Sequence, residues 1–534
     1  MHAEVVADKH ALVREANHLV ELAQLGQAHE VLQTVERRLT ELAGGNMQTG
    51  PAALHFARAV ALMYDDDVAA LAAVEDMLRA AVRENSQGWA ACALAMRATQ
   101  KQVLGDQDPA LYDVNAVLAD LTAAEAALDR SADGGRIDSR AHVAISNGYA
   151  PLRLYELAVP HQEAAFRISL DGAGPDDAAP SMWLLNLTIL NLEWALDLYR
   201  VGLDREAEQH SALAYDHATY ALDRLNADAV AGWKPSCQLF QAAARSDGVR
   251  PTGAVAEIQR LLPVVRELGD AHEYLLAVPF LAVGLMREGR REESLAVIEQ
   301  ALAEVRPSDR TSTTYLSLAH THAVLIVNGG SEEAKAAMEY GNALAAASWR
   351  ERQRTLDSAE TMRKYAQLQA EHDQVTRAAE SDALTGVANR RCFDRHVEAL
   401  ASTGDPGRPV AVLFVDLDEF KVVNDSLGHA AGDTMLQGVA RVIAANAREG
   451  DLVARIGGDE FAVLLPGAST EDTERAAQRI VVAVRDTQSL PLVSIGGAAG
   501  SARDVRATVV RADDAMYVAK RGGRDRHHVA PSLA

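Results

Sequence analysis

Hydrophobic residues recur with a helical period over most of the first two thirds of the chain. From about residue 10 to residue 347, apolar side chains fall at i, i+3, i+4 and i+7, and alanine, leucine and glutamate dominate. Short breaks that contain glycine, aspartate or proline interrupt this pattern. The sequence therefore predicts an all-α domain over residues 1–347.

One segment of this region has the spacing of a tetratricopeptide repeat (TPR), in which two antiparallel helices need a glycine at the turn and small residues where they cross. In the segment 278–301, Gly289 takes the turn position, and Ala282 and Ser294 take the close-packing positions. Pro307 would mark the end of the repeat. The resemblance implies a helical repeat that docks a protein partner or regulates the rest of the chain.

Weaker matches to the same repeat surround Gly26 and Gly202, and Ala195 and Ala207 keep the offsets relative to Gly202. We therefore expect a TPR-like helical solenoid. The alternative is a helical bundle without repeats, which would show the same helical periodicity.

Residues 348–380 are polar and contain neither glycine nor proline, which is typical of one continuous helix. Their apolar positions alternate in steps of three and four, as in a heptad seam. The pattern predicts a linker that pairs with its twin in a homodimer, although a lone amphipathic helix has the same pattern. The seam positions are Tyr365, Leu368, His372, Val375 and Ala379.

From residue 381 to residue 534 the pattern changes to alternating strands and helices, which is typical of an α/β layer with a mixed sheet. Two of the predicted strands, Val410–Leu417 and Leu492–Ala499, are mostly apolar. The other predicted elements are a hairpin around Gly457 and helices near 391–400, 432–448, 471–485 and 511–520.

The charge of the chain is uneven. The net charge is −23; acidic residues outnumber basic ones by 20 before Ser381 and by only 3 from there on. Because contacts with phosphate backbones need clustered lysine and arginine, so acidic a region disfavours binding to nucleic acid or to an anionic membrane.

Cysteine usage and hydropathy suggest a cytoplasmic protein. The three cysteines, Cys92, Cys237 and Cys392, are far apart and form no CxxC or Cys/His metal motif. The first residues lack the features of a signal peptide, and the longest nearly continuous apolar run has 12 residues, from Leu275 to Met286. We therefore expect no membrane span, which needs about 20 apolar residues.

Acidic residues end two of the predicted strands. Asp416 follows the strand that begins at Val410, and Asp459 and Glu460 follow Gly457 and Gly458 in the hairpin. Carboxylates bind hard cations, and glycine allows a phosphate to approach the backbone closely. If the two strands are neighbours, these carboxylates converge, as a metal-assisted phosphoryl-transfer site requires. For the two glycines, a plain type I′ hairpin turn is the alternative.

These motifs resemble the GGDEF family of diguanylate cyclases, which condense two GTP into cyclic di-GMP. The resemblance rests on the runs 455–461 (RIGGDEF), 416–421 (DLDEFK), 382–391 (DALTGVANRR) and 517–525 (YVAKRGGRD). It implies the palm-like fold shared with nucleotide cyclases and polymerases. It also implies Mg²⁺ (or Mn²⁺) held by Asp416, the Leu417 carbonyl, Asp459 and Glu460, with Asp459 and Glu460 as the catalytic pair.

The resemblance also assigns the substrate. A site that recognises guanine needs an amide and a carboxylate, because the edge of the base offers one hydrogen-bond acceptor and two donors. The resemblance implies that Asn424 and Asp433 supply these groups, with His429 nearby. Alternatives are a loop turn for Asn424 and a helix cap for Asp433. Further substrate contacts implied by the family are Gly457 and Gly458, which leave room for phosphate, and Lys520 and Arg524, which would bind the triphosphate or else are surface charges.

Arg448 and Asp451 stand nine and six residues before Gly457, the offset of the family's product-binding inhibitory site. The alternative is a plain helix-to-strand turn. We therefore expect a cyclase that acts as a dimer, with feedback by its product. The rivals are a catalytically silent receptor for cyclic di-GMP or GTP, and a TPR scaffold in which the cyclase is subordinate.

Overall fold

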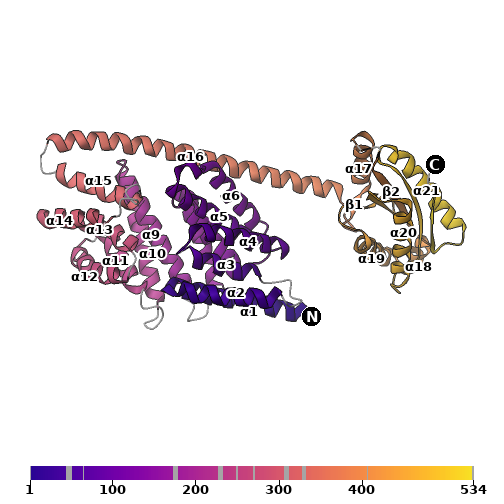
Figure 1. The fold of residues 1–534 in the computed structure, drawn as a ribbon, viewed down its shortest axis with the longest axis horizontal. Coiled ribbons are helices and arrows are strands. Elements are labelled where there is room, and N and C mark those ends of the chain that lie inside the picture. The colour runs from indigo at the N-terminus through magenta and orange to yellow at the C-terminus, as the bar shows by residue number, and fades with distance from the viewer. Residues whose placement is uncertain are drawn as a thin grey trace. The chain divides into compact units, whose positions relative to one another are not determined.

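The computed structural model describes residues 2–43, 51–63, 65–171, 179–225, 233–247, 251–268, 271–305, 312–327, 332–403, 405 and 407–531. The chain forms two compact units, Met1–Gln367 and Leu368–Ala534. In Figure 1 the first unit is drawn entirely as helices, and the second as a sheet with helices around it. The predicted fold class, a helical region followed by an α/β domain with a mixed sheet, is confirmed.

Successive helices of the first unit pack against one another, as α9 does against α10 and α7 against α8. Two large hydrophobic cores result: one lies among α1–α8 and one among α9–α15. The helices are α1 (His2–Leu22), α2 (Ala28–Ala43), α3 (Pro51–Leu62), α4 (Asp67–Arg83), α5 (Gln87–Gln107), α6 (Val114–Leu128), α7 (Gly135–Tyr149), α8 (Tyr155–Leu170), α9 (Ala179–Tyr199), α10 (Asp204–Arg224), α11 (Trp233–Asp247), α12 (Ala254–Glu267), α13 (Ala271–Arg287), α14 (Arg291–Glu304) and α15 (Thr313–Val327).

The helix–turn–helix predicted around Gly289 is present. Gly289 has a φ of +79° between α13 and α14, a conformation that glycine adopts without steric cost. Ala282 and Ser294 are fully buried, and the Ser294 hydroxyl donates a hydrogen bond of 2.6 Å to the Ala282 carbonyl. Small residues therefore do sit where the two helices cross.

The weaker matches have the same local geometry. Gly202 has a φ of +75° between α9 and α10, and Ala195 and Ala207 are fully buried in one small cluster. Gly26 has a φ of +87° between α1 and α2. That these pairs are TPR repeats stays a prediction, and Pro307 lies outside the described residues.

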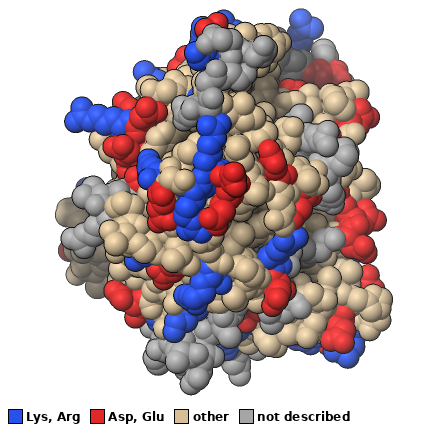
Figure 2. All heavy atoms as spheres, turned by 90° about the vertical axis from the view of Figure 1, so that its left-hand side faces the viewer, with Lys and Arg blue, Asp and Glu red and all other residues tan. Residues whose placement is uncertain are grey.

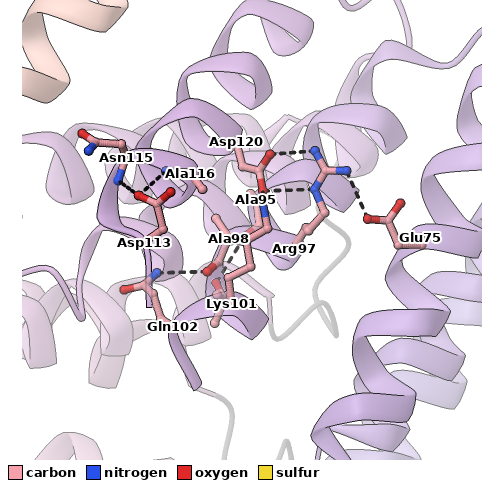
Figure 3. A network of polar contacts seen from close by, with 11 residues as sticks. Glu75, Ala95, Arg97, Ala98, Lys101, Gln102, Asp113, Asn115, Ala116 and Asp120 are labelled. Atoms are coloured by element: carbon pink, nitrogen blue, oxygen red, sulfur yellow. Dashed lines mark hydrogen bonds and ion pairs between the residues drawn. The ribbon is translucent and has the colours of Figure 1, made fainter. Parts of the chain in front are cut away.

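A partly buried network of charges joins α4, α5 and α6 (Figure 3). Arg97 donates two hydrogen bonds, of 3.0 and 2.6 Å, to the Asp120 carboxylate and one of 3.1 Å to Glu75. Lys101 donates to the same aspartate at 2.7 Å. Because a buried carboxylate is costly unless it is paired, the bidentate Arg97 contact explains how Asp120, only 6% exposed, lies inside this unit.

Positive and negative side chains are interspersed over the face shown in Figure 2, which belongs to the end of the first unit that carries α12 and α14. Among the charged residues of α12 and α14 and the turn before α14, Arg266 is paired with Glu304 at 2.8 Å, and Arg290 with Glu293 at 2.7 Å. Such pairing neutralises these two basic side chains locally.

The predicted linker belongs to a longer helix, α16 (Glu332–Glu380), which begins 16 residues before the expected boundary at 348. Its middle part is packed on the first unit: Leu356 and Ala359 belong to the core formed by α1–α8. Arg352 pairs with Glu156, and Arg363 pairs with Glu125 at 2.6 Å. Half of the expected linker is therefore packed against the helical unit.

The second unit contains a sheet in the order β1-β3-β4-β2-β5-β6, in which β1–β3 and β5–β6 are parallel and the other pairs antiparallel. The alternate residues of β2 enter two different cores, one on each face of the sheet, which explains its apolar sequence. The strands are β1 (Ala388–Asn389), β2 (Pro409–Leu417), β3 (Leu452–Arg455), β4 (Glu460–Pro466), β5 (Val493–Ser501) and β6 (Arg526–Val529).

Among the described residues of this unit, five α-helices accompany the sheet: α17 (Arg390–Thr403), α18 (Phe420–Leu427), α19 (His429–Asn446), α20 (Thr470–Arg485) and α21 (Val505–Arg521). Residues of α19 and α20 enter one core and those of α17 and α21 the other. The short elements β1, β6 and α18 were not predicted. Among the described residues, no helix has the length and hydrophobicity that crossing a bilayer requires.

Helix α21 touches the backbone of β5 at Gly496, where an added Cβ would lie 1.9 Å from the Met516 nitrogen and 2.4 Å from the Ala512 oxygen. We predict that Gly496→Ala lowers the free energy of unfolding of this unit by about 3 kcal/mol, because two backbones would have to separate. Chemical denaturation, monitored by hydrogen exchange of the β5 amides, measures this free energy of unfolding. The control is Gly458→Ala, since a Cβ there meets nothing within 4 Å; equal stability of both variants would contradict the prediction.

Candidate functional site

The acidic residues of the two predicted strand ends lie side by side. In the antiparallel pair β2–β4, Asp416 is directly opposite Glu460, and the Leu417 amide donates a hydrogen bond of 3.2 Å to the Asp459 carbonyl. Opposite residues on one face of such a pair have Cβ atoms about 5 Å apart. The expected pairing of the two strands is confirmed, and it gathers three carboxylates at one end of the sheet.

Lysine from α21 balances part of this negative charge. The Lys520 ammonium donates to Asp416 at 2.6 Å, and the Asp416 side chain is 11% exposed. Burial raises the pKa of Asp416, Lys520 opposes that shift, and the charges of Asp459 and Glu460 add to it. Lys520, expected to bind a triphosphate, here contacts an expected metal ligand instead.

The turn that carries Asp459 is not a type I′ hairpin turn. Neither Gly457 nor Gly458 has a positive φ, which that turn requires at both central residues. Arg455 holds the turn instead: its guanidinium donates to the Gly458 carbonyl at 2.6 Å and to Asp382 at 3.2 Å. Burial would raise the pKa of Asp382, but hydrogen bonds from Thr385 and Arg455 lower it overall.

The predicted base-reading residues lie on two consecutive helices. Asn424 is in α18, so the loop-turn alternative is wrong for it. His429 is the first residue of α19 and Asp433 lies in its second turn, so Asp433 does not cap this helix. His429 and Asp433 are exposed. Between them, Gly432 makes room for Asn424: a Cβ there would lie 2.0 Å from the Asn424 amide oxygen.

The segment after α21 is pinned by Asp418, a carboxylate that the sequence motifs leave without a role. Asp418, 9% exposed, accepts a hydrogen bond from the Ser494 hydroxyl at 2.7 Å and from the Asp525 amide at 3.0 Å. Next to it, Arg524 pairs with Glu419 at 2.6 Å. Asp418 therefore positions the loop that carries Arg524. The sequence alone did not indicate this structural role, because Asp418 lies in a run of acidic residues.

Arg448 and Asp451 lie between α19 and β3 and bind each other. The Arg448 amide and its Nε donate to the Asp451 carboxylate at 2.9 and 3.1 Å, and another nitrogen of the guanidinium donates to the Pro466 carbonyl at 2.6 Å. The Arg448 side chain is 56% exposed, whereas that of Asp451 is 3% exposed. The arginine is thus accessible, and the carboxylate orients it.

The carboxylate cluster has the chemistry of a divalent-cation site. Within the described residues no three His, Cys, Asp or Glu side chains form a ready-made metal site. Burial is the main cause of the raised pKa of Asp416, and the charges of Asp459 and Glu460 add to it, so the three carboxylates lie close enough to interact. Carboxylate and carbonyl oxygens are the ligands that Mg²⁺ and Mn²⁺ prefer. Asp416, Leu417, Asp459 and Glu460 therefore fit such an ion.

Known proteins match this chain in its C-terminal part. Residues 379–526 match the family model described as "Diguanylate cyclase, GGDEF domain". Diguanylate cyclase TpbB of Pseudomonas aeruginosa is 43% identical over 176 residues, which cover 31% of this chain and 40% of TpbB. Probable diguanylate cyclase DgcE of Escherichia coli is 38% identical over 163 residues, 29% of this chain and 15% of DgcE.

A crystal structure of the coiled coil and GGDEF domain of DgcB from Caulobacter crescentus in complex with c-di-GMP is 30% identical; the match covers 33% of this chain and 97% of that one, with a TM-score of 0.29. The chain spans less than half the length of the two curated relatives. The C-terminal unit is a GGDEF domain with diguanylate cyclase homologues.

Proposed function

We propose that this protein is a diguanylate cyclase that condenses two GTP into cyclic di-GMP and releases two pyrophosphates. The observation that carries the proposal is the opposition of Asp416 and Glu460 across β2 and β4 beside the Asp459 turn, within a domain that matches the GGDEF family. Phosphoryl transfer needs this concentration of carboxylates to hold a cation, and the adjacent glycines leave space for phosphate.

In this proposal Asp416, the Leu417 carbonyl, Asp459 and Glu460 hold Mg²⁺ or Mn²⁺. A cation held there would supply positive charge to the triphosphate and would lower the pKa of the attacking 3′-hydroxyl. Asp459, on the turn that Arg455 holds, is the group that takes up the hydroxyl proton. Glu460 fixes the geometry of the pair from the first position of β4.

The remaining residues bind substrate. Asn424 and Asp433 pair with the guanine edge, His429 lies next to them, and Gly457 and Gly458 face the phosphates. Lys520 and Arg524 then exchange their present partners, Asp416 and Glu419, for triphosphate oxygens. Both lie on or just after α21, so one short segment supplies both cations.

Dimerisation is part of the proposed mechanism, because one GGDEF domain holds one GTP and two must meet. Support comes from α16, on which the seam residues Tyr365, Leu368 and Val375 are 70%, 54% and 67% exposed. Apolar side chains at heptad spacing on an exposed helix favour pairing with a second copy. Since GTP is the substrate, we place the enzyme in the cytoplasm.

To test the metal site, we predict that Asp459→Asn or Asp416→Asn lowers cyclic di-GMP synthesis by about 100-fold or more with the fold intact, because each removes a cation ligand. Turnover with GTP and Mg²⁺, followed by mass spectrometry of the product, measures this. Asp513→Asn, an exposed position on α21, is the matched control. Activity of Asp459→Asn close to that of the control would exclude Asp459 from the site.

We also propose that cyclic di-GMP binds at Arg448 and Asp451 and inhibits the enzyme. The exposed guanidinium is oriented by a buried carboxylate, as a clamp for a phosphate or a guanine edge requires. We predict that Arg448→Ala keeps the initial rate but raises the late product yield. The control Arg441→Ala, on α19, should leave both the initial rate and the late yield unchanged. Equal inhibition of wild type and Arg448→Ala by added cyclic di-GMP would refute the clamp.

The continuous α16 is the element through which we propose that the helical unit controls the dimer. Insertion of two residues at Ala370, beyond the packed part of the helix, rotates the C-terminal end of α16 by about 200° and should abolish coupled activity. Insertion of four residues rotates the same end by about 40° beyond a full turn and should largely preserve activity. Equal activity of both variants, at every protein concentration, would make α16 a passive tether.

A further inference from the structure

The loop between α21 and β6, residues 522–525, has an unusual backbone conformation. Arg524 has a φ of +60° and Asp525 a φ of +49°, and both follow Gly523 at +120°. Residues other than glycine rarely adopt a positive φ, although aspartate and asparagine do so more often than most. Two such residues in succession persist only where the surrounding structure fixes the backbone. The contacts of this loop therefore determine where the Arg524 side chain lies.

Asp525 is held through its amide, its carbonyl and its carboxylate. The amide donates a hydrogen bond of 3.0 Å to the carboxylate of Asp418, which directly follows β2. Arg485, in the last turn of α20, donates to the Asp525 carboxylate from Nε at 2.9 Å. A second nitrogen of the same guanidinium donates to the Asp525 carbonyl at 2.9 Å. Two separate elements thus bind one residue, and we call these contacts the Asp525 clasp.

The Asp418 half of the clasp is fixed in the sheet. Asp418 is 9% exposed, and its second carboxylate oxygen accepts a hydrogen bond from the Ser494 hydroxyl at 2.7 Å. Ser494 lies in β5, where it pairs with Asp416 of β2 on one side and with Arg526 of β6 on the other. The sheet therefore connects the clasp to Asp416, a residue of the proposed cation site.

The conformation of the loop also sets the direction of Arg524. Its guanidinium donates to Glu419 at 2.6 Å, and the side chains of both residues are more than half exposed. Glu419 directly precedes α18, the helix that carries Asn424. Arg524 thus extends toward the acidic end of β2 and stays accessible to a ligand, while its direction depends on a strained backbone.

We propose that Asp525 and Arg485 are positioning residues that hold Arg524 where it binds the triphosphate of the substrate, an inference that rests on the proposed function. Asp525 acts through Arg524, and Arg485 acts through Asp525. An arginine suits this position because its planar fork binds a carboxylate and a carbonyl at once. Without the clasp the backbone relaxes toward negative φ, and the Arg524 guanidinium is no longer held in one direction.

A purely structural role of the clasp would have a different signature. A clasp that only fastened β6 to the sheet would change the binding of every ligand alike, through the folded fraction of the domain. A positioning role is restricted to ligands that carry phosphates, because Arg524 contacts no other part of the nucleotide in this proposal. Binding that is uniform in the ground and transition states changes KM and leaves kcat unaltered.

The test uses the full chain with Mg²⁺ and two probes. The first is 3′-deoxy-GTP, which lacks the attacking hydroxyl and is not turned over, measured by isothermal titration calorimetry. The second is guanosine, which lacks phosphates, measured by ligand-observed NMR. We expect Arg485→Ala to weaken 3′-deoxy-GTP binding by about tenfold and to leave guanosine binding unchanged. With GTP, the same variant should raise KM and keep kcat within about twofold. The control is Arg475→Ala on the same helix, where Arg475 pairs with Asp472 at 2.5 Å.

Two substitutions of Asp525 separate the backbone from the charge. Asp525→Asn keeps a residue that tolerates a positive φ and an oxygen that accepts from Arg485, so it should bind 3′-deoxy-GTP within about threefold of wild type. Asp525→Val loses both features and should bind at least about tenfold more weakly.

Three results would overturn the inference: wild-type affinity of Arg485→Ala for 3′-deoxy-GTP, an equal loss of guanosine binding in that variant, or equal affinities of the two Asp525 variants. The Arg485→Ala result stands even if Asp525→Val does not fold. Failure of the wild-type chain to bind 3′-deoxy-GTP would overturn the proposed function together with this inference, which distinguishes the two failures.

Discussion

The antiparallel pairing of β2 with β4 is the constraint on which the candidate site depends. Its register sets Asp416 opposite Glu460, and the same pairing brings the Asp459 carbonyl to the Leu417 amide. Strand side chains alternate between faces, so a shift of one residue would turn Asp416 toward the opposite core. The two hydrophobic cores that β2 enters prevent such a shift, because each apolar side chain would then change sides. Core packing thus determines where the carboxylates lie.

The sequence was informative where local chemistry decides the structure. The apolar run that became β2, the glycines between β3 and β4 and the heptad spacing of α16 each follow from the residues themselves. The turns between helices at Gly202 and Gly289 were predictable for the same reason, since glycine adopts the left-handed backbone conformation of these turns without steric cost. The family resemblance then supplied the roles that geometry alone leaves open.

Features that the sequence could not supply depend on contacts between distant residues. The packing of α16 is one example: Leu356, Ala359 and the Arg363–Glu125 pair hold the first half of the predicted linker against the helical unit, which its own heptad pattern does not indicate. The sequence motifs assign Asp418 no role, and only its hydrogen bonds from Ser494 and Asp525 show it to be a structural anchor. The short strand β6 forms only because β5 offers a free edge.

The contact between Lys520 and Asp416 has a thermodynamic consequence for the proposed enzyme. A lysine that neutralises Asp416 competes with a divalent cation for that carboxylate, and it cannot contact a triphosphate at the same time. Withdrawal of the lysine by a nucleotide would strengthen cation binding, and cation binding would by reciprocity strengthen nucleotide binding. In the proposed enzyme, positive heterotropic cooperativity between metal and nucleotide would therefore arise from one ammonium group, which keeps the carboxylates partly charge-balanced when both ligands are absent.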